Sequence, residues 1–222
     1  MPPLLRVEFH CHTRFSIDSL VEPARLVETC RQRGIDRLVV TDHNTIAGAR
    51  RAHEIDPGLV IVGEEIMTDQ GELLAAFVKE EIPRDLPAEE AIRRLREQDA
   101  FISVSHPFDR FRGKYWSRKQ LKKLAHQVDA IEIFNSRCIP ARLNHEAAAF
   151  AQEHRLAGTA GSDAHTLFEV GRAVMLLPEF SDAQSLRTAM KSVKYETRLS
   201  PWWVRFGSRY AVLKKALSRP NS

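Results

Sequence analysis

Short apolar segments alternate along the chain with longer segments in which apolar residues recur every three or four positions. The short segments are typical of strands and the longer ones of helices. Strands are predicted over residues 4–9, 38–41, 59–62, 73–78, 101–104, 130–134, 157–160 and 173–177. Helices are predicted over residues 24–33, 45–54, 87–98, 117–126, 140–154 and 182–192. This alternation predicts βα units and a parallel sheet, hence the α/β class.

The number of strands and the length of the chain favour a closed architecture. About seven of the strands could close into a barrel with the helices outside. Because the 222 residues contain no internal repeat and no linker-like segment, we expect one barrel domain over residues 1–195. Residues 196–222 are expected to form a basic, aromatic extension that packs on this barrel.

Histidine and acidic side chains follow the predicted strands at the points where the strands end. The set consists of His10, His12, His43, Glu65, His106, Asp163 and His165, with Asp18 in the loop after His12 and Glu72 at the start of the strand that follows Glu65. The carboxyl ends of parallel barrel strands share one face, so these side chains are expected to meet there. Imidazole and carboxylate ligands together suit zinc, manganese or iron. The sequence therefore predicts a multinuclear metallohydrolase.

The spacing of the histidines supports joint ligation. Alternate residues of a strand point to the same side, so His10 and His12 can hold one ion together, and so can Asp163 and His165. Any one of these residues alone is more often a capping or hydrogen-bonded residue. Their grouping at the ends of several strands favours metal ligation for the whole set.

Five sequence motifs, in this order, resemble those of the PHP (polymerase and histidinol phosphatase) family. They are FHCHTRFSID at 9–18, TDH at 41–43, GEE at 63–65, SHPF at 105–108 and GSDAH at 161–165. The resemblance spans residues 6 to about 177. It implies a distorted (β/α)₇ barrel that holds two to three divalent metal ions and hydrolyses phosphate esters.

The resemblance also implies which residues hold each ion. The first ion is assigned to His10, His12, Glu65 and Asp163, the second to Glu65, Glu72 and His106, and the third to Asp18, His43 and His165. Many family members have a histidine where this chain has Glu72. A carboxylate is a harder ligand, and it shifts the expected preference from zinc toward manganese, iron or magnesium.

The expected reaction is attack on phosphorus by a hydroxide held between the two ions that Glu65 bridges. Glu65, Asp163 and His43 are therefore the residues assigned to catalysis. Arginine matches the oxygen atoms of a phosphate group, so the arginines near the motifs are candidates for substrate binding. They are Arg14, Arg112 and Arg137, and for each of them a solvated surface position is the alternative.

Positive charge is concentrated at the end of the chain. Residues 187–222 contain nine Lys or Arg and one acid, whereas the rest of the chain has a net negative charge. Within this segment Phe206, Tyr210, Leu213 and Leu217 recur at helical spacing among basic residues. We expect a terminal helix that packs on the barrel and exposes its cationic side. Peripheral membrane contact aided by Trp202 and Trp203, or nucleic-acid contact, are the alternatives.

The substrate predicted from these features is a phosphorylated small molecule or a nucleotide. A nuclease or RNA-end exonuclease, an amidohydrolase and a non-catalytic PHP binding module are the competing functions. Amidohydrolases with two metal ions usually need a bridging lysine, a role that Glu65 fills here. Three cysteines, an odd number without metal-finger spacing, favour a reducing cytoplasm. The longest apolar runs are too short for a membrane span, and the pattern leaves the oligomeric state open.

Overall fold

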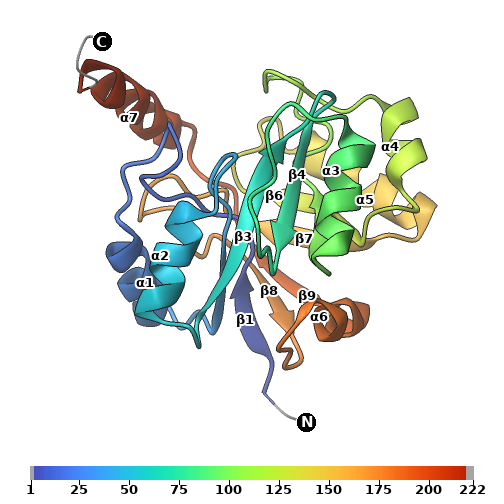
Figure 1. Cartoon of the computed structure of the whole chain (residues 1–222), viewed down its shortest axis with the longest axis horizontal. Helices are drawn as coiled ribbons and strands as arrows, with labels where there is room; N and C mark the ends of the chain where they lie inside the picture. The colour runs from blue at the N-terminus through green and yellow to red at the C-terminus, as the bar shows by residue number, and fades with distance from the viewer. Residues whose placement is uncertain (1–2, 219–222) are drawn as a thin grey trace.

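A computed structural model describes residues 3–218, and its centre is one mixed sheet (Figure 1). The strands of this sheet lie in the order β7-β6-β5-β4-β3-β2-β1-β8-β9. Their bounds are Leu5–Glu8 (β1), Arg37–Val40 (β2), Val60–Met67 (β3), Glu72–Ala76 (β4), Phe101–Val104 (β5), Ala130–Asn135 (β6), Ala157–Gly161 (β7), Ala173–Leu177 (β8) and Lys194–Thr197 (β9).

Helices cover the outside of this sheet (Figure 1). The α-helices are Pro23–Gln32 (α1), Ala47–Ile55 (α2), Ala88–Glu97 (α3), Arg118–Leu124 (α4), Arg142–His154 (α5), Ala183–Ala189 (α6) and Arg205–Leu217 (α7). Two short 3₁₀ helices, Met190–Ser192 and Trp202–Val204, follow α6 and precede α7. Among residues 3–218 we find no helix with the length and apolar character required to cross a bilayer.

The sheet nearly closes into a barrel, as predicted. Closure occurs where the segment after β1 meets the segment after β7, and the His12 N–H donates to the Ala164 carbonyl oxygen at 2.8 Å. The two edge strands of the sheet, β7 and β9, also contact each other: the Tyr195 hydroxyl of β9 donates to the Gly158 carbonyl oxygen of β7 at 2.9 Å. The distorted barrel expected from the family resemblance is therefore present in a single α/β domain.

The expectation of parallel strands holds for only part of the sheet. Strands β1, β2 and β3 are parallel, and so are β5, β6 and β7. Strand β4 runs antiparallel to both neighbours, and β8 runs antiparallel to β1 and β9. The turn between β3 and β4 explains the first reversal: Thr68 N–H donates to the Gly71 carbonyl oxygen at 2.9 Å, and so short a connection can join only antiparallel strands.

Local sequence signals set the ends of several helices. Helix α1 starts at Pro23, and Gly34 beyond its end has φ +63°, a conformation that favours glycine. Ser117 caps α4 through a reciprocal pair of hydrogen bonds with Gln120, and Asp182 caps α6 in the same way with Ser185. These signals explain why the helices match the sequence-based expectation to within a few residues.

An apolar layer supports the polar end of the barrel. Phe9 and Phe101 are fully buried and contact edge to face, with ring centroids 5.7 Å apart. Leu74 of β4 pairs with Glu65 of β3 across the sheet, so it lies on the same face as that carboxylate. Cys11, Cys30 and Cys138 are buried free thiols. The metal-ligand candidates therefore stand above a close-packed core.

Helix α7 faces the barrel with a different side from the one expected. Lys215 Nζ donates to the carbonyl oxygens of Arg14 (2.6 Å) and Ser16, and Ala211 is buried. The apolar residues at helical spacing, Phe206, Tyr210, Leu213 and Leu217, are all exposed. The expectation that this helix buries its apolar side is not met, because main-chain acceptors of the barrel attract the Lys215 amine instead. Arg209 and Lys214 are exposed, as expected.

Candidate metal centre

The nine side chains predicted to bind metal come together at one end of the barrel. His10 and His12 follow β1, His43 follows β2, His106 follows β5, and Asp163 and His165 follow β7. Glu65 lies inside β3, which extends five residues beyond its expected end, and Glu72 starts β4. Seven of the nine are buried, whereas Asp18 and His43 are partly exposed. The centre therefore opens to solvent beside these two residues.

The first predicted group surrounds one point. His10 Nε2 lies 3.3 Å from Glu65 Oε2 and 3.5 Å from Asp163 Oδ1. His12 Nε2 lies 3.4 Å and 3.2 Å from the same two oxygen atoms. Two imidazole nitrogens and two carboxylate oxygens are thus arranged alternately at the separations found among ligands of a single ion. One potential ligand atom of each of His10, His12 and Asp163 lies within 4.8 Å of the other two.

The second group uses the other oxygen of Glu65. His106 Nε2 lies 3.0 Å from Glu65 Oε1 and 3.2 Å from Glu72 Oε2. His43 Nδ1 approaches the same two carboxylates, at 3.1 Å from Glu65 Oε2 and 3.5 Å from Glu72 Oε1. Glu65 is therefore placed to bridge two positions, and Glu72 lies where the second position needs a ligand.

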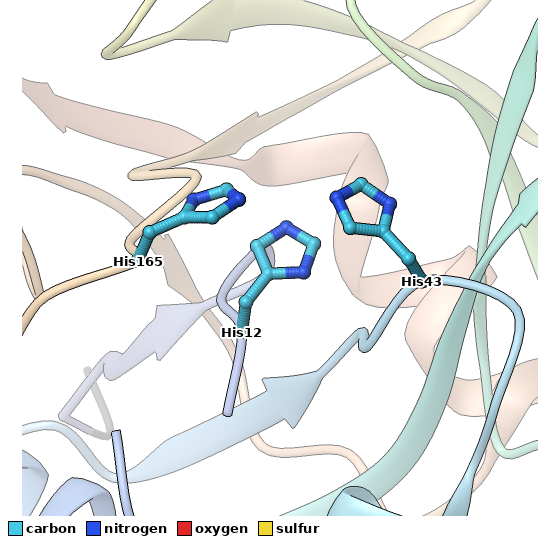
Figure 2. A group of neighbouring side chains, drawn as sticks. All are labelled: His12, His43 and His165. Atoms are coloured by element: carbon cyan, nitrogen blue, oxygen red, sulfur yellow. The ribbon is translucent and has the colours of Figure 1, made fainter. Parts of the chain in front are cut away.

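The third group lies at the open edge of the centre. His165 Nε2 is 2.9 Å from Asp18 Oδ2, and His43 Nε2 is 3.6 Å from the same atom. Figure 2 shows the rings of His43 and His165 on either side of His12, although the three residues come from different parts of the chain. The centroid of the His12 ring is 4.4 Å from that of His43 and 4.2 Å from that of His165.

The unpaired atoms of the centre fit divalent cations. Among residues 3–218, six of the nine side chains have a buried polar atom without a hydrogen-bond partner: His10 Nε2, His12 Nε2, Asp18 Oδ1, Glu65 Oε2, Asp163 Oδ1 and His165 Nε2. Buried polar atoms are normally hydrogen-bonded, since leaving one unpaired costs about 1–3 kcal/mol. Four of these atoms, those of His10, His12, Glu65 and Asp163, surround the first position. Mixed imidazole and carboxylate ligands suit manganese, iron and zinc.

The electrostatics of the centre also favour cations. Burial opposes ionisation of Glu65, but the neighbouring His10 and His43 outweigh it and hold the pKa of Glu65 well below its usual range. Burial, together with His165 and His43, holds the pKa of His12 well below its usual range, which keeps its imidazole neutral. A neutral imidazole and an ionised carboxylate are the forms that bind metal.

Protons and cations compete for the imidazoles of His43 and His106. Burial lowers the pKa of His43, but Glu65, Asp18 and Glu72 outweigh it and raise that pKa to about 10. Burial and Arg112 lower the pKa of His106, whereas its contacts with Glu65 and Glu72 raise it to about 9. The carboxylates thus retain positive charge on these rings, and a divalent ion could replace the protons.

Two of the candidate ligands have unusual backbone conformations. Asp163 has φ +53° and His106 has φ +23°, values that are uncommon for residues other than glycine. Such conformations persist where the surrounding structure fixes them, and they concentrate at functional sites. Here the Asn135 Nδ2 donates to Asp163 Oδ2 at 3.2 Å, and the His106 N–H donates to Glu132 Oε2 at 2.8 Å.

Glu132 is a site residue that the sequence analysis missed. Its Oε1 lies 2.8 Å from His10 Nδ1, and its Oε2 accepts from the His106 N–H at 2.8 Å and from Asn135 Nδ2 at 3.1 Å. A carboxylate that accepts a hydrogen bond from Nδ1 leaves Nε2 free to bind metal and fixes the orientation of the imidazole ring. The available signal was a single acid inside the otherwise apolar strand segment 130–134.

Two further buried acids hold the loops of the centre. Asp42 accepts from the Thr13 N–H (2.7 Å) and from the Ser16 hydroxyl (2.6 Å), which fixes the turn after His12. Glu8 accepts from the Ser162 N–H at 3.0 Å and from the Gly171 N–H at 2.8 Å. Burial raises the pKa of Glu8 to about 7 despite these hydrogen bonds.

Of the three arginines predicted to bind phosphate, the structure places one in the centre. Arg112 contacts Asp163 through Nη2, and its side chain is 22% exposed, so it can reach both the ligands and the solvent. Arg14 points away and pairs with Glu22 at 3.1 Å on the surface.

The position of Arg137 argues against a phosphate contact. It is buried, and its Nε lies 2.8 Å from Glu169 Oε1. Its Nη2 donates to the Ser208 hydroxyl at 2.8 Å, and its Nη1 lies 2.9 Å from His165 Nδ1. The guanidinium nitrogens of Arg137 therefore already have partners within the protein, and they link the His165 segment to the C-terminal extension. Sequence position alone did not distinguish Arg14 and Arg137 from Arg112.

Comparison with known proteins assigns the family. Residues 8–76 match the model of the PHP domain, and residues 141–194 match a model described as PHP-associated. The uncharacterized protein MJ0417 of Methanocaldococcus jannaschii is 34% identical over 180 residues, which cover 80% of this chain and 72% of that protein.

Solved structures share the fold at lower identity. One is a two-domain protein from Bacteroides vulgatus, described as containing a predicted PHP-like metal-dependent phosphoesterase. It has a TM-score of 0.72 and 20% identity over 88% of this chain, which spans 65% of that protein. Another is PfuEndoQ, a lesion-specific endonuclease from Pyrococcus furiosus, with a TM-score of 0.63 and 16% sequence identity. The match covers 86% of this chain and 57% of the PfuEndoQ chain.

Proposed function

The chain belongs to the PHP family, and from that premise we propose that it is a metal-dependent phosphoesterase acting on a phosphorylated small molecule or a nucleotide. One observation carries the proposal. Unpaired, buried imidazole and carboxylate atoms converge at the end of the barrel where Arg112 also projects. An enzyme that cleaves phosphate esters has to stabilise accumulated negative charge, and this arrangement combines cation ligands with a phosphate-binding group.

The candidate ligands divide into three groups that would hold the cations. They are His10, His12, Glu65 and Asp163, then Glu65, Glu72 and His106, then Asp18, His43 and His165. When bound, such ions neutralise phosphoryl oxygens and supply an activated water near neutral pH. The preference for manganese or iron over zinc follows from the second carboxylate, Glu72, in the second group.

Arg112 is the residue we assign to substrate binding. Its side chain is partly exposed, and its guanidinium contacts Asp163. A phosphate group offers the same planar pairing as a carboxylate, with more charge. Arg112 can therefore exchange its Asp163 contact for the substrate and hold the phosphoryl group against the ligands. Asp163, Glu65 and His43 lie in the same centre and are the other residues assigned to catalysis.

The test is a substrate screen with matched variants. Protein stripped with EDTA and reloaded with manganese is assayed on phosphomonoesters, cyclic and bis-phosphorylated nucleotides, and short RNA. We expect turnover of a phosphomonoester or nucleotide that EDTA abolishes. Arg112→Ala should raise KM by about 10- to 100-fold, since a hydrogen bond to a charged group contributes about 1.5–3 kcal/mol. Arg110→Ala, exposed on the same loop, is the control and should leave KM unchanged.

The same screen separates the competing functions. Cleavage of RNA alone, falling steeply with salt, would replace our proposal with a nuclease. Full activity after EDTA treatment would exclude the metal-dependent mechanism. A protein that binds manganese at these residues but turns over none of the panel would favour the non-catalytic binding module.

A further inference from the structure

An apolar stripe runs along the exposed side of α7. It consists of Trp202, Phe206, Tyr210, Leu213 and Leu217, which follow one another at intervals of three or four residues. Their exposed fractions range from 56% for Phe206 to 78% for Leu217. Surface helices normally bury such a stripe against the core. Because the stripe is exposed here, it requires another explanation.

The opposite side of α7 fixes this orientation. Lys215 donates to the carbonyl oxygens of Arg14 and Ser16, and Ser208 accepts from Arg137 at 2.8 Å. Ala211 is buried between these two positions. Polar contacts with main-chain and side-chain groups of the barrel therefore attach the helix. Figure 1 shows α7 projecting from the body of the molecule, with its far end away from the sheet.

The apolar surface continues from the stripe onto the barrel. The rings of Trp203 and Phe168 lie 5.0 Å apart, and both side chains are 47% exposed. The Arg172 guanidinium covers Phe168 at 4.5 Å from the ring centroid. The exposed surface is thus wider than one helix, and its margin on the barrel is also cationic.

The charged residues of α7 are all cationic. Arg209 and Lys214 are exposed on either flank of the stripe, and Arg205 lies nearby. The sequence contains no acidic residue after Glu196. An apolar stripe with tryptophan and tyrosine, bordered by arginine and lysine, matches the boundary between acyl chains and anionic headgroups.

We propose that this stripe and its flanking cations form a docking surface for an anionic lipid membrane. The apolar side chains enter the headgroup region, while Arg209 and Lys214 contact lipid phosphates. A second copy of the chain fits less well, because a symmetric contact would bring like charges together. Nucleic acid also fits less well, because Leu213 and Leu217 interrupt the aromatic side chains on which bases would stack.

Docking would place the metal centre near the bilayer. Lys215 bonds to the loop that carries Asp18, which is a partly exposed ligand of the centre. The stripe lies on the other side of the same helix, about 10 Å away across a helix with its side chains. This inference concerns location and is independent of the reaction proposed above.

Vesicle sedimentation with the full chain tests the proposal. We expect binding to vesicles of phosphatidylcholine with 30% phosphatidylglycerol, about 10-fold or more above binding to pure phosphatidylcholine, and weaker at high salt. Leu213→Gln with Leu217→Gln should reduce binding by about 10- to 100-fold. The matched control, Leu4→Gln with Ile55→Gln, changes two apolar residues exposed elsewhere and should bind normally.

A second pair of variants tests the charge. Arg209→Glu with Lys214→Glu should reduce binding to the anionic vesicles by about 30-fold or more and abolish the preference for them. Equal sedimentation of all variants would overturn the proposal. Binding to single-stranded DNA without binding to vesicles would also overturn it. So would a dimer, detected by light scattering, that dissociates into monomers in the leucine variant.

Discussion

Glu132 connects three parts of the metal centre through one carboxylate. It contacts His10 Nδ1, the His106 N–H and Asn135 Nδ2, and it is buried. In Glu132→Gln an amide N–H₂ replaces one acceptor oxygen, so one of these donors loses its partner. Loss of such an outer hydrogen bond typically weakens metal binding by about 10- to 100-fold. We expect that change for manganese, measured by competition with a chelating dye.

A surface glutamate provides the control for this substitution. Glu153→Gln on α5 changes an exposed side chain and should leave the manganese affinity unaltered. If Glu132→Gln bound manganese as tightly as the original protein, the carboxylate would have no part in positioning His10. Thermal unfolding of both variants would show whether the change in affinity arises from general destabilisation.

At the residue scale, the sequence was informative about ligands and uninformative about their supports. His10, His12 and Asp163 are reactive residue types at strand ends, and the spacing of two brings the side chains of His10 and His12 to one side. Glu132 is 122 residues from His10, and no local pattern shows which side chain a buried acid will contact. The contacts of Arg137 were unpredictable for the same reason: its partner Glu169 is set by the packing of distant segments.

The end of β7 shows how an element positions a ligand. Gly161 is its last residue, and a Cβ atom there would overlap with the Cβ of His10. Gly161→Ala should therefore displace His10 and destabilise the fold by about 1–3 kcal/mol. We expect weaker manganese binding and a lower denaturant midpoint, measured by dye competition and by urea unfolding. Retention of both would show that β7 adjusts without moving the histidine.

Gly158 in the same strand is the matched control. A Cβ atom there would meet the Ile133 side chain at 2.6 Å, on the face away from His10. Gly158→Ala is expected to lower stability through this contact while manganese affinity stays the same. The two alanine variants together separate damage to the strand from damage to the metal centre.

Most elements were predictable because local signals define them. Pro23, Ser117 and Asp182 start helices close to the expected positions. The direction of β4 follows from its short connection to β3, whereas the orientation of α7 depends on tertiary contacts. Hydropathy predicts that an apolar helix side faces the core, but it does not register main-chain carbonyl groups that can accept from Lys215.

On the scale of the whole molecule, closure of the sheet creates the centre. The candidate ligands lie between residues 10 and 165 of the chain, and they meet only because the segments after β1 and β7 are hydrogen-bonded to each other. The barrel followed from the alternation of elements and the family resemblance, whereas the reversal of β4 and β8 did not. Antiparallel and parallel strands can carry the same apolar pattern when both faces are covered, so composition does not distinguish them.

Joining distant segments also makes the fold dependent on its cations. A divalent ion bound to residues that only the folded chain brings together stabilises that state, by about 2.7 kcal/mol at a concentration 100 times its Kd. For a chain of this length about 1 kcal/mol raises Tm by about 2–4 °C. Manganese should therefore raise the Tm of EDTA-treated protein by about 5–10 °C, as followed by calorimetry. Asp163→Asn, which removes a ligand charge, should show a smaller rise, and an equal Tm with and without manganese would contradict cation binding at this centre.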